Sequence, residues 1–170
     1  MYYRTKTYIA GDWTTDIAVV NKLREWNTSK YWSLSFTDAH DITHARDSSL
    51  NCSIKSSLKT RLDASKTFVL IVGDKTKSLT AGSCQHCPSY NSWTKCCARY
   101  HSVDYRSFIT YECEVAARDI DKIVVIYNST YVDKSKCPDA VKNIGTHIPA
   151  YYYIGTEKYW NYDQIKKALG

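Results

Sequence analysis

Two uninterrupted apolar runs constrain the fold of this chain more than any other feature. They lie in "KTFVLIVGD", residues 66–74, and in "DKIVVIYNS", residues 121–129. Both are far shorter than the roughly 20 apolar residues of a membrane span. A short strand that is apolar on both faces is typical of a parallel sheet covered by helices on both sides. The two runs therefore predict two central strands of an α/β fold.

Shorter segments complete this pattern. Three further strands are expected at residues 7–11, 31–38 and 148–155, where β-branched and aromatic residues gather or alternate. Apolar residues at helical spacing predict helices over residues 12–26, 47–65, 106–120 and 161–170. Alternation of strands and helices favours a doubly wound sheet. We therefore expect a flavodoxin-like α/β fold with about five parallel strands and helices on both faces.

The chain length of 170 residues suits one domain with one sheet. Residues 77–106 interrupt the alternation, because they are polar, aromatic and rich in cysteine and lack a clear period. The expected organisation is a single domain over residues 1–170 that contains a cysteine-rich insertion at residues 77–106.

Charge and hydropathy exclude several classes of function. The net charge is +6, but the Lys and Arg residues are scattered and form no basic stripe of the kind that nucleic-acid binders show. No stretch has the apolar length of a membrane span or of the core of a signal peptide. We therefore expect a cytoplasmic protein that binds neither nucleic acid nor membrane.

The seven cysteines are expected to be reduced in that compartment. Cys84 and Cys87 have the spacing of a zinc knuckle, and Cys96, Cys97 and His101 follow in the same segment. Cys84, Cys87, Cys97 and His101 could complete a tetrahedral zinc site. Such a site would be structural, pinning an insertion without a core of its own. The alternative is a set of reduced, partly buried thiols.

Two acids lie two residues apart in the helix predicted by "FITYECEVAARD", residues 108–119. At about 100° per residue, Ile109, Cys113 and Ala116 share one apolar stripe. Glu114 then points to solvent, whereas Glu112 lies at the edge of the stripe. Partial burial should raise the pKa of Glu112, and acids of this kind are enriched at functional sites. The structural alternative is a glutamate paired with a nearby Lys or Arg.

Polar residues also follow the first predicted strand, in "AGDW". Ligands of doubly wound sheets bind at the carboxyl ends of the strands. An acid and an aromatic at Asp12 and Trp13 could hold a ribose hydroxyl and stack on a base, although a plain turn with a helix cap would look the same. The G-x-G-x-x-G fingerprint of dinucleotide cofactors is missing after this strand. A dehydrogenase is therefore not expected.

Four segments in this order resemble the TIR-like domains of bacterial and archaeal signalling proteins, including those of Thoeris antiphage systems. They are "AGDWTTD" after the first strand, the loop and helix over residues 37–65, the strand and turn "TFVLIVGDKT", and the helix start "FITYECEVA". The resemblance implies a flavodoxin-like fold. In active members it also implies cleavage of NAD at the nicotinamide–ribose bond.

The resemblance assigns the catalytic glutamate to Glu112 and a nucleotide site to Gly11, Asp12, Trp13 and Asp16. Tyr111 is a further aromatic that could flank the nicotinamide or the adenine. NAD would be a substrate, and no cofactor would be required. The product would be ADP-ribose or a cyclic isomer, sensed by a downstream effector protein, and the enzyme could act as a homo-oligomer. The alternative is a TIR-like module without catalysis that acts as a scaffold.

Overall fold

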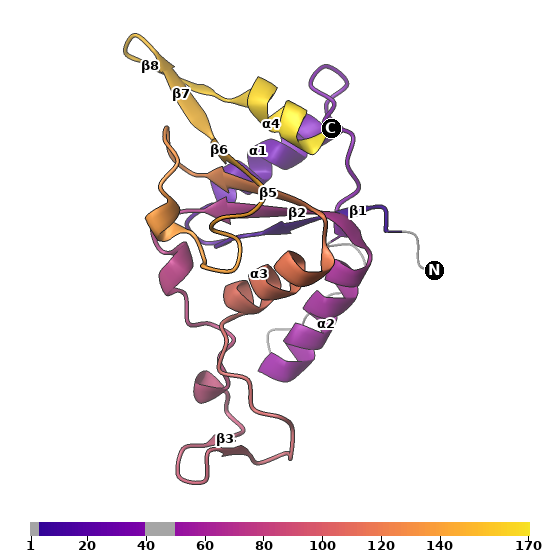
Figure 1. The fold of residues 1–170 in the computed structure, drawn as a ribbon, viewed down its shortest axis with the longest axis vertical. Coiled ribbons are helices and arrows are strands. Elements are labelled where there is room, and N and C mark those ends of the chain that lie inside the picture. The colour runs from indigo at the N-terminus through magenta and orange to yellow at the C-terminus, as the bar shows by residue number, and fades with distance from the viewer. Residues whose placement is uncertain (1–3, 40–49) are drawn as a thin grey trace.

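The computed structural model describes residues 4–39 and 50–170. Within them, the central sheet has four parallel strands in the order β1-β2-β5-β6 (Figure 1). These strands are β1 (Lys6–Ala10), β2 (Ser65–Val72), β5 (Lys122–Tyr127) and β6 (Thr146–Pro149). Both apolar runs form the centre of this sheet, as predicted. The part of the 37–65 segment at residues 40–49 lies outside the described residues.

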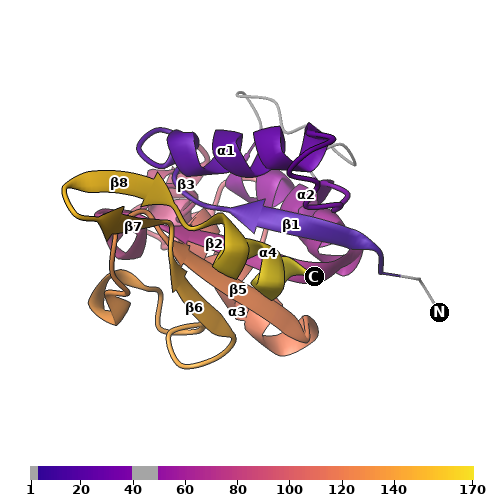
Figure 2. The same ribbon diagram turned by 90° about the horizontal axis from the view of Figure 1, so that it is seen from above.

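Helices cover both faces of the sheet (Figures 1 and 2). One face carries α1 (Ile17–Thr28) and α4 (Tyr162–Leu169), and the other carries α2 (Asn51–Asp63) and α3 (Phe108–Asp119). Along β2, Phe68 packs in the core beneath α2 and α3, whereas Val69 packs in the core beneath α1. The sheet thus separates two apolar cores, and the doubly wound, flavodoxin-like fold class is confirmed.

The strand expected at residues 31–38 does not form. In this segment, strand-like pairing is limited to one bridge between Thr7 and Asp38, so the sheet has four strands in the described residues rather than five. Ser33 and Ser35 adopt φ of 34° and 56°, a left-handed conformation that a strand cannot contain. The side chain of Asn27 bonds both the N–H and the C=O of Phe36, each at 2.8 Å, and so replaces a neighbouring strand.

The strand expected at residues 148–155 is divided in two. Its first part belongs to β6, and its second part is β7 (Tyr151–Ile154), which pairs antiparallel with β8 (Glu157–Trp160). This hairpin projects beyond the sheet (Figure 1). Gly155 makes its turn with φ of 62°, a conformation that glycine adopts without strain.

The segment between β2 and α3 extends away from the sheet (Figure 1). It contains two single-turn helices, η2 (Thr76–Ser78) and η3 (Cys84–His86), and a short hairpin of β3 (Tyr90–Asn91) and β4 (Cys96–Cys97). Every side chain from residue 85 to residue 102 is at least partly exposed. This protruding segment therefore has no apolar core of its own.

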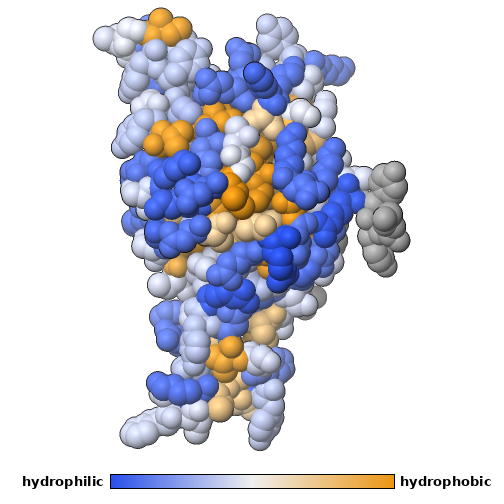
Figure 3. All heavy atoms as spheres, viewed as in Figure 1, coloured by the Kyte–Doolittle hydropathy of each residue, from blue (hydrophilic) through white to orange (hydrophobic). Residues whose placement is uncertain are grey.

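The outer surface is largely hydrophilic. In the view of Figure 3, charged and polar side chains cover the helices, and apolar side chains emerge in a strip across the middle of the molecule. A further single-turn helix, η4 (Lys134–Lys136), precedes β6 and carries two lysines. None of the helices in the described part of the chain has the length and apolar character needed to cross a membrane.

Candidate functional site

Helix α3 begins at a defined point and turns one acid inward. Ser107 caps the helix, because its Oγ accepts a hydrogen bond from the N–H of Thr110 at 3.1 Å. From this start, Ile109 and Cys113 are buried against the sheet, as the helical rotation predicts. Glu114 is exposed and pairs with Arg106.

Glu112 is more deeply buried than a position at the edge of the stripe requires, with only 8% of its surface exposed. The hydroxyl of Tyr8, on β1, donates a hydrogen bond to its Oε1. Burial raises the pKa of Glu112 from 4.5 to about 7, against the opposing effects of the Tyr8 hydrogen bond and the charge of Arg61. The predicted rise of this pKa is confirmed.

Glu112 lines a cavity of about 300 Å³ at the carboxyl end of β1. The polar part of its lining comes from Tyr8, Asp12, Arg61 and Glu112. The apolar part includes Ile54 and Leu58 from α2, Leu79 from the segment after β2, and Phe108 and Ile109 from α3. The edge of the sheet and two helices therefore enclose a single buried acid.

The turn after β1 supplies the rim of this cavity through Gly11, Asp12 and Trp13. The carboxylate of Asp12 accepts hydrogen bonds from the N–H of Thr14 at 2.9 Å and from the hydroxyl of Thr15 at 2.8 Å. The Thr14 hydrogen bond is the main cause that lowers the pKa of Asp12. Asp12 is therefore charged at neutral pH, whereas the carboxyl group of Glu112, which lines the same cavity, is only partly charged.

Trp13 has 38% of its surface exposed, and the guanidinium carbon of Arg24 lies 4.9 Å from its ring centroid. A cation at this distance orients the ring through its π face. Trp13 also lines the cavity that contains Glu112. An aromatic side chain, Trp13, and the buried acid Glu112 thus line the same cavity.

The structure does not bring the other two predicted residues to this cavity. Asp16 lines a separate hollow of about 170 Å³ with Gly73 and Asn128, and its Oδ1 accepts a hydrogen bond from Asn128 Nδ2 at 2.8 Å. Tyr111 lies under the guanidinium of Arg106, 4.9 Å from its ring centroid. Their roles in nucleotide binding remain predictions.

Two residues of the site were missing from the sequence-based prediction. Tyr8 lies inside a strand between Thr7 and Ile9, so its hydroxyl could be assigned a partner only once α3 was placed. Arg61 is 8% exposed and directly precedes a core leucine on α2, so its neighbours depend on how α2 packs against α3. The one local signal was a cationic residue beside the apolar stripe of that helix.

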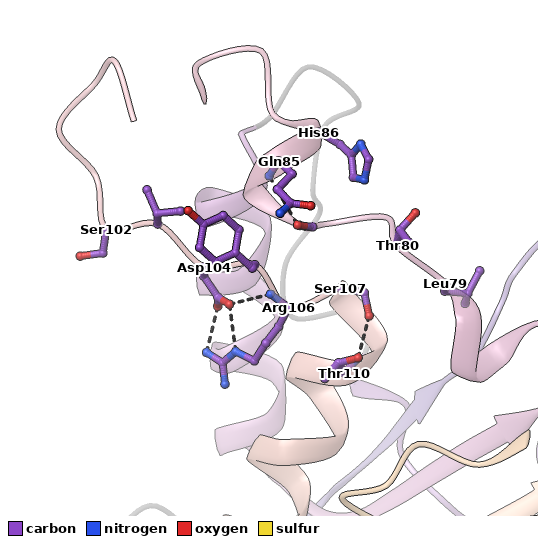
Figure 4. Close-up of a pocket in the computed structure, with 12 residues that line it drawn as sticks. Leu79, Thr80, Gln85, His86, Ser102, Asp104, Arg106, Ser107 and Thr110 are labelled. Atoms are coloured by element: carbon purple, nitrogen blue, oxygen red, sulfur yellow. Dashed lines mark hydrogen bonds and ion pairs between the residues drawn. The ribbon is translucent and has the colours of Figure 1, made fainter. Parts of the chain in front are cut away.

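A larger hollow of about 850 Å³ lies between the protruding segment and the start of α3 (Figure 4). Two lining residues, Arg106 and Asp104, carry opposite charges and form an ion pair, in which Arg106 Nε donates to Asp104 Oδ1 at 2.9 Å. Arg106 Nη1 also donates to Glu114 Oε2 at 2.8 Å. Burial opposes ionisation of Asp104, but hydrogen bonds from Arg106 and Lys55 lower its pKa to about 2. This hollow shares Leu79 with the Glu112 cavity, and the acid in its described lining, Asp104, has a lowered pKa.

The four predicted zinc ligands lie close together. Cys84, Cys87, Cys97 and His101 line one small cavity of about 10 Å³ beneath the protruding segment. In residues 4–39 and 50–170, no group of three or more His, Cys, Asp or Glu side chains is already positioned to hold a metal ion. Zinc binding is therefore still a prediction.

A parallel sheet with helices on both faces, and a cleft at the carboxyl end of β1, define a doubly wound α/β domain. Residues 7–81 match the family model described as Thoeris protein ThsB, TIR-like domain. The resemblance to the TIR-like domains of Thoeris systems is thereby confirmed for that range, which is just under half of the chain.

The matched range includes the turn at Gly11, Asp12 and Trp13 and the cavity-lining residues of α2. It ends before α3, so Glu112 lies beyond it. No match was found among curated proteins.

Proposed function

We propose that this protein cleaves NAD at the bond between nicotinamide and ribose, with Glu112 as the catalytic residue. The products would be nicotinamide and ADP-ribose or a cyclic isomer, which would act as a signal to an effector protein in antiphage defence. One observation carries the proposal. The single acid that α3 turns inward lines a cavity beside the turn matched to the ThsB TIR-like family.

The chemistry of the reaction suits a lone carboxylate. Nicotinamide leaves NAD as a neutral ring, so its departure needs no metal and no proton. The ribose is left with oxocarbenium character, as in glycoside hydrolysis. A preorganised negative charge beside that carbon stabilises the transition state more than the neutral ground state of the sugar. Glu112 supplies this charge when it is ionised, and the Tyr8 hydrogen bond fixes its position.

The surroundings of Glu112 strengthen this effect. Ile54, Leu58 and Phe108 form an apolar wall that limits water and lowers the local screening of charge. We expect Asp12, ionised on the rim, to accept hydrogen bonds from ribose hydroxyls, and Trp13 to provide a face for stacking. A volume of about 300 Å³ is at the lower end for ligand pockets and fits half of a dinucleotide. The adjoining hollow beyond Leu79 gives the other half room.

The test is the release of nicotinamide from NAD, followed by chromatography, for the wild type, Glu112→Gln and Glu114→Gln. The two glutamates share one helix, but Glu114 is exposed and paired with Arg106, which makes it a matched control. We expect Glu112→Gln to lower the rate by at least roughly 100-fold, as for loss of one preorganised group that stabilises transition-state charge. Glu114→Gln should retain the wild-type rate.

Full activity of Glu112→Gln would overturn the assignment. The assay is run on purified protein and in lysate of phage-infected cells, because a trigger or an assembly partner could be required. Absence of nicotinamide release in both, from folded wild-type protein, would favour the alternative of a TIR-like scaffold without catalysis.

A further inference from the structure

The small cavity beneath the protruding segment has a fifth donor that the spacing of residues did not reveal. Cys52 lies in the first turn of α2, 32 residues before Cys84, and lines the cavity together with Cys84, Cys87, Cys97 and His101. We propose that Cys52 joins Cys84, Cys87 and Cys97 as the four thiolate ligands of a structural zinc ion. The metal would join the protruding segment to the body of the domain.

One distance among these donors bears on which of them binds the metal. The Cys52 Sγ lies 3.0 Å from His101 Nδ1. A sulfur and a nitrogen bound to one tetrahedral zinc are about 3.5 Å apart, given bond lengths of about 2.3 and 2.0 Å. In the present arrangement the Cys52–His101 contact is a hydrogen bond, which is shorter than the edge of a coordination tetrahedron. His101 is assigned as the partner that donates to the Cys52 thiolate, a common arrangement around bound metals.

The local backbone supports a thiolate site. Cys84 is the first residue of η3 and Cys87 follows its last residue, and the Cys87 N–H donates to the Cys84 carbonyl at 3.0 Å. The N–H of Asp104 donates to the Cys84 Sγ at 3.3 Å, and such a bond stabilises negative charge on sulfur. The β3–β4 hairpin pairs Tyr90 with Cys97 and so directs the third thiol to the same place.

The size of the cavity fits one ion. Its volume of about 10 Å³ is close to that of a single water-sized probe. The thiols line the cavity without yet standing in coordination positions, and a cysteine side chain reaches a new position by rotation about one bond. On binding, each ligating thiol releases its proton to solvent and donates an electron pair from sulfur to zinc.

The protruding segment also needs such a link. All side chains over residues 85–102 are partly or fully exposed, so apolar burial cannot hold this segment in place. Segments that lack a core are commonly stabilised by a metal. In the described residues, polar bonds from α2 add to the link: Asn51 Nδ2 donates to the Ser83 carbonyl at 3.0 Å, and Lys55 Nζ donates to the Arg106 carbonyl at 2.7 Å.

The proposed site differs from the site predicted from the sequence by a single ligand, because Cys52 of α2 replaces His101 of the protruding segment. The zinc content of purified protein from metal-replete growth is measured for the wild type, Cys52→Ser, Cys87→Ser and Cys96→Ser. Cys96 is the matched control, because it neighbours Cys97 but does not line the cavity. We expect about one zinc per chain in the wild type and Cys96→Ser, and below roughly a tenth in the other two variants.

Zinc below about a tenth of an equivalent in the wild type would overturn the site. Wild-type zinc content in Cys52→Ser would overturn the role of Cys52. Cobalt(II) provides a second readout, because thiolate ligands in tetrahedral geometry give intense visible absorption. We expect this absorption in the wild type and in His101→Ala, and its loss from His101→Ala would overturn the assignment of four thiolates.

Limited proteolysis tests the link itself. A chelator should accelerate cleavage within residues 85–102 of the wild type and should have no further effect on Cys52→Ser. Unchanged cleavage of zinc-depleted wild type would overturn the structural role of the metal. None of these readouts depends on NAD cleavage, so they stand or fall separately from the proposed function.

Discussion

At the scale of single residues, the site depends on the pair formed by Tyr8 and Glu112. Burial, together with the nearby charge of Glu112, raises the pKa of Tyr8 well above 10, so its hydroxyl stays protonated and remains a donor. The pKa of Glu112, at about 7, means that its carboxyl group is roughly half ionised at neutral pH. The ionised fraction of a catalytic carboxyl group with this pKa would change steeply with pH in the neutral range.

The substitution Tyr8→Phe tests this pairing. Because the hydrogen bond from Tyr8 stabilises the ionised carboxyl group, its loss should raise the pKa of Glu112 further. If the reaction needs the ionised form, kcat/KM for NAD rises with pH through that pKa. The rise should be centred near pH 7 in the wild type and about one pH unit higher in the variant, for a bond worth about 1 to 1.5 kcal/mol.

The measurement is the pH profile of kcat/KM for both proteins. Phenylalanine retains the ring that stacks on Phe68 at 5.8 Å, so folding should be preserved. A rise at the same or lower pH in Tyr8→Phe would contradict the role given to the hydroxyl.

The residue scale also shows how far sequence reasoning reaches. The position and the raised pKa of Glu112 follow from helix geometry, which is local. Its partners Tyr8 and Arg61 lie 104 and 51 positions away in the chain, on β1 and α2. Those neighbours depend on how two helices pack over the sheet, which no local pattern contains.

At the scale of elements, the connection into α3 sets the shape of the cavity. Gly82 has φ of 97°, and a Cβ at this position would lie 2.5 Å from ring atoms of Phe108 and 2.7 Å from its nitrogen. Phe108 lines the cavity and is the first residue of α3. A change at Gly82 therefore affects both the stability of the connection and the position of an apolar wall.

We expect Gly82→Ala to lower the free energy of unfolding by about 2 to 4 kcal/mol, from the left-handed conformation and the overpacking together. It should also raise KM for NAD. Gly155→Ala is the matched control, because φ is 62° there but no atom lies within 4 Å of the added Cβ. The control should lose only about 1 to 2 kcal/mol and leave KM unchanged.

Chemical denaturation and steady-state kinetics of the two variants check this prediction. Equal losses of stability in both would show that contact with Phe108 has no effect. An unchanged KM in Gly82→Ala would show that the wall near Phe108 does not shape the NAD site.

The elements differ in how well their sequence defines them. The two central strands were predictable because runs of five or more apolar residues can be buried only with both faces covered. The alternating segment at residues 31–38 was misleading, because its inward side chains, such as Leu34, pack against α1 without pairing to a strand. Alternation records which side chains are buried, but hydrogen bonding by Asn27 decided the backbone.

At the scale of the whole molecule, a buried acid with a raised pKa opposes folding at neutral pH. The pKa of Glu112 is about 7 in the folded state, against 4.5 as the ordinary value. Between these values the folded state binds more protons than the unfolded state, so the free energy of unfolding falls as pH rises. A difference of about 2.5 units corresponds to roughly 3 kcal/mol, reached in full above pH 7.

Glu112→Gln should remove this dependence while keeping the shape of the side chain. The variant should therefore exceed the wild type in stability at pH 8, by up to about 3 kcal/mol, and the difference should shrink toward pH 5. Denaturant unfolding at several pH values measures it, and Glu114→Gln should follow the wild-type curve to within about 1 kcal/mol, because its ion pair is exposed.

A stability difference for Glu112→Gln that is independent of pH would show that Glu112 is ionised in the folded protein throughout this range. The carboxyl group would then be held charged by its surroundings, and the rise of catalytic rate through pH 7 would have to arise from another group.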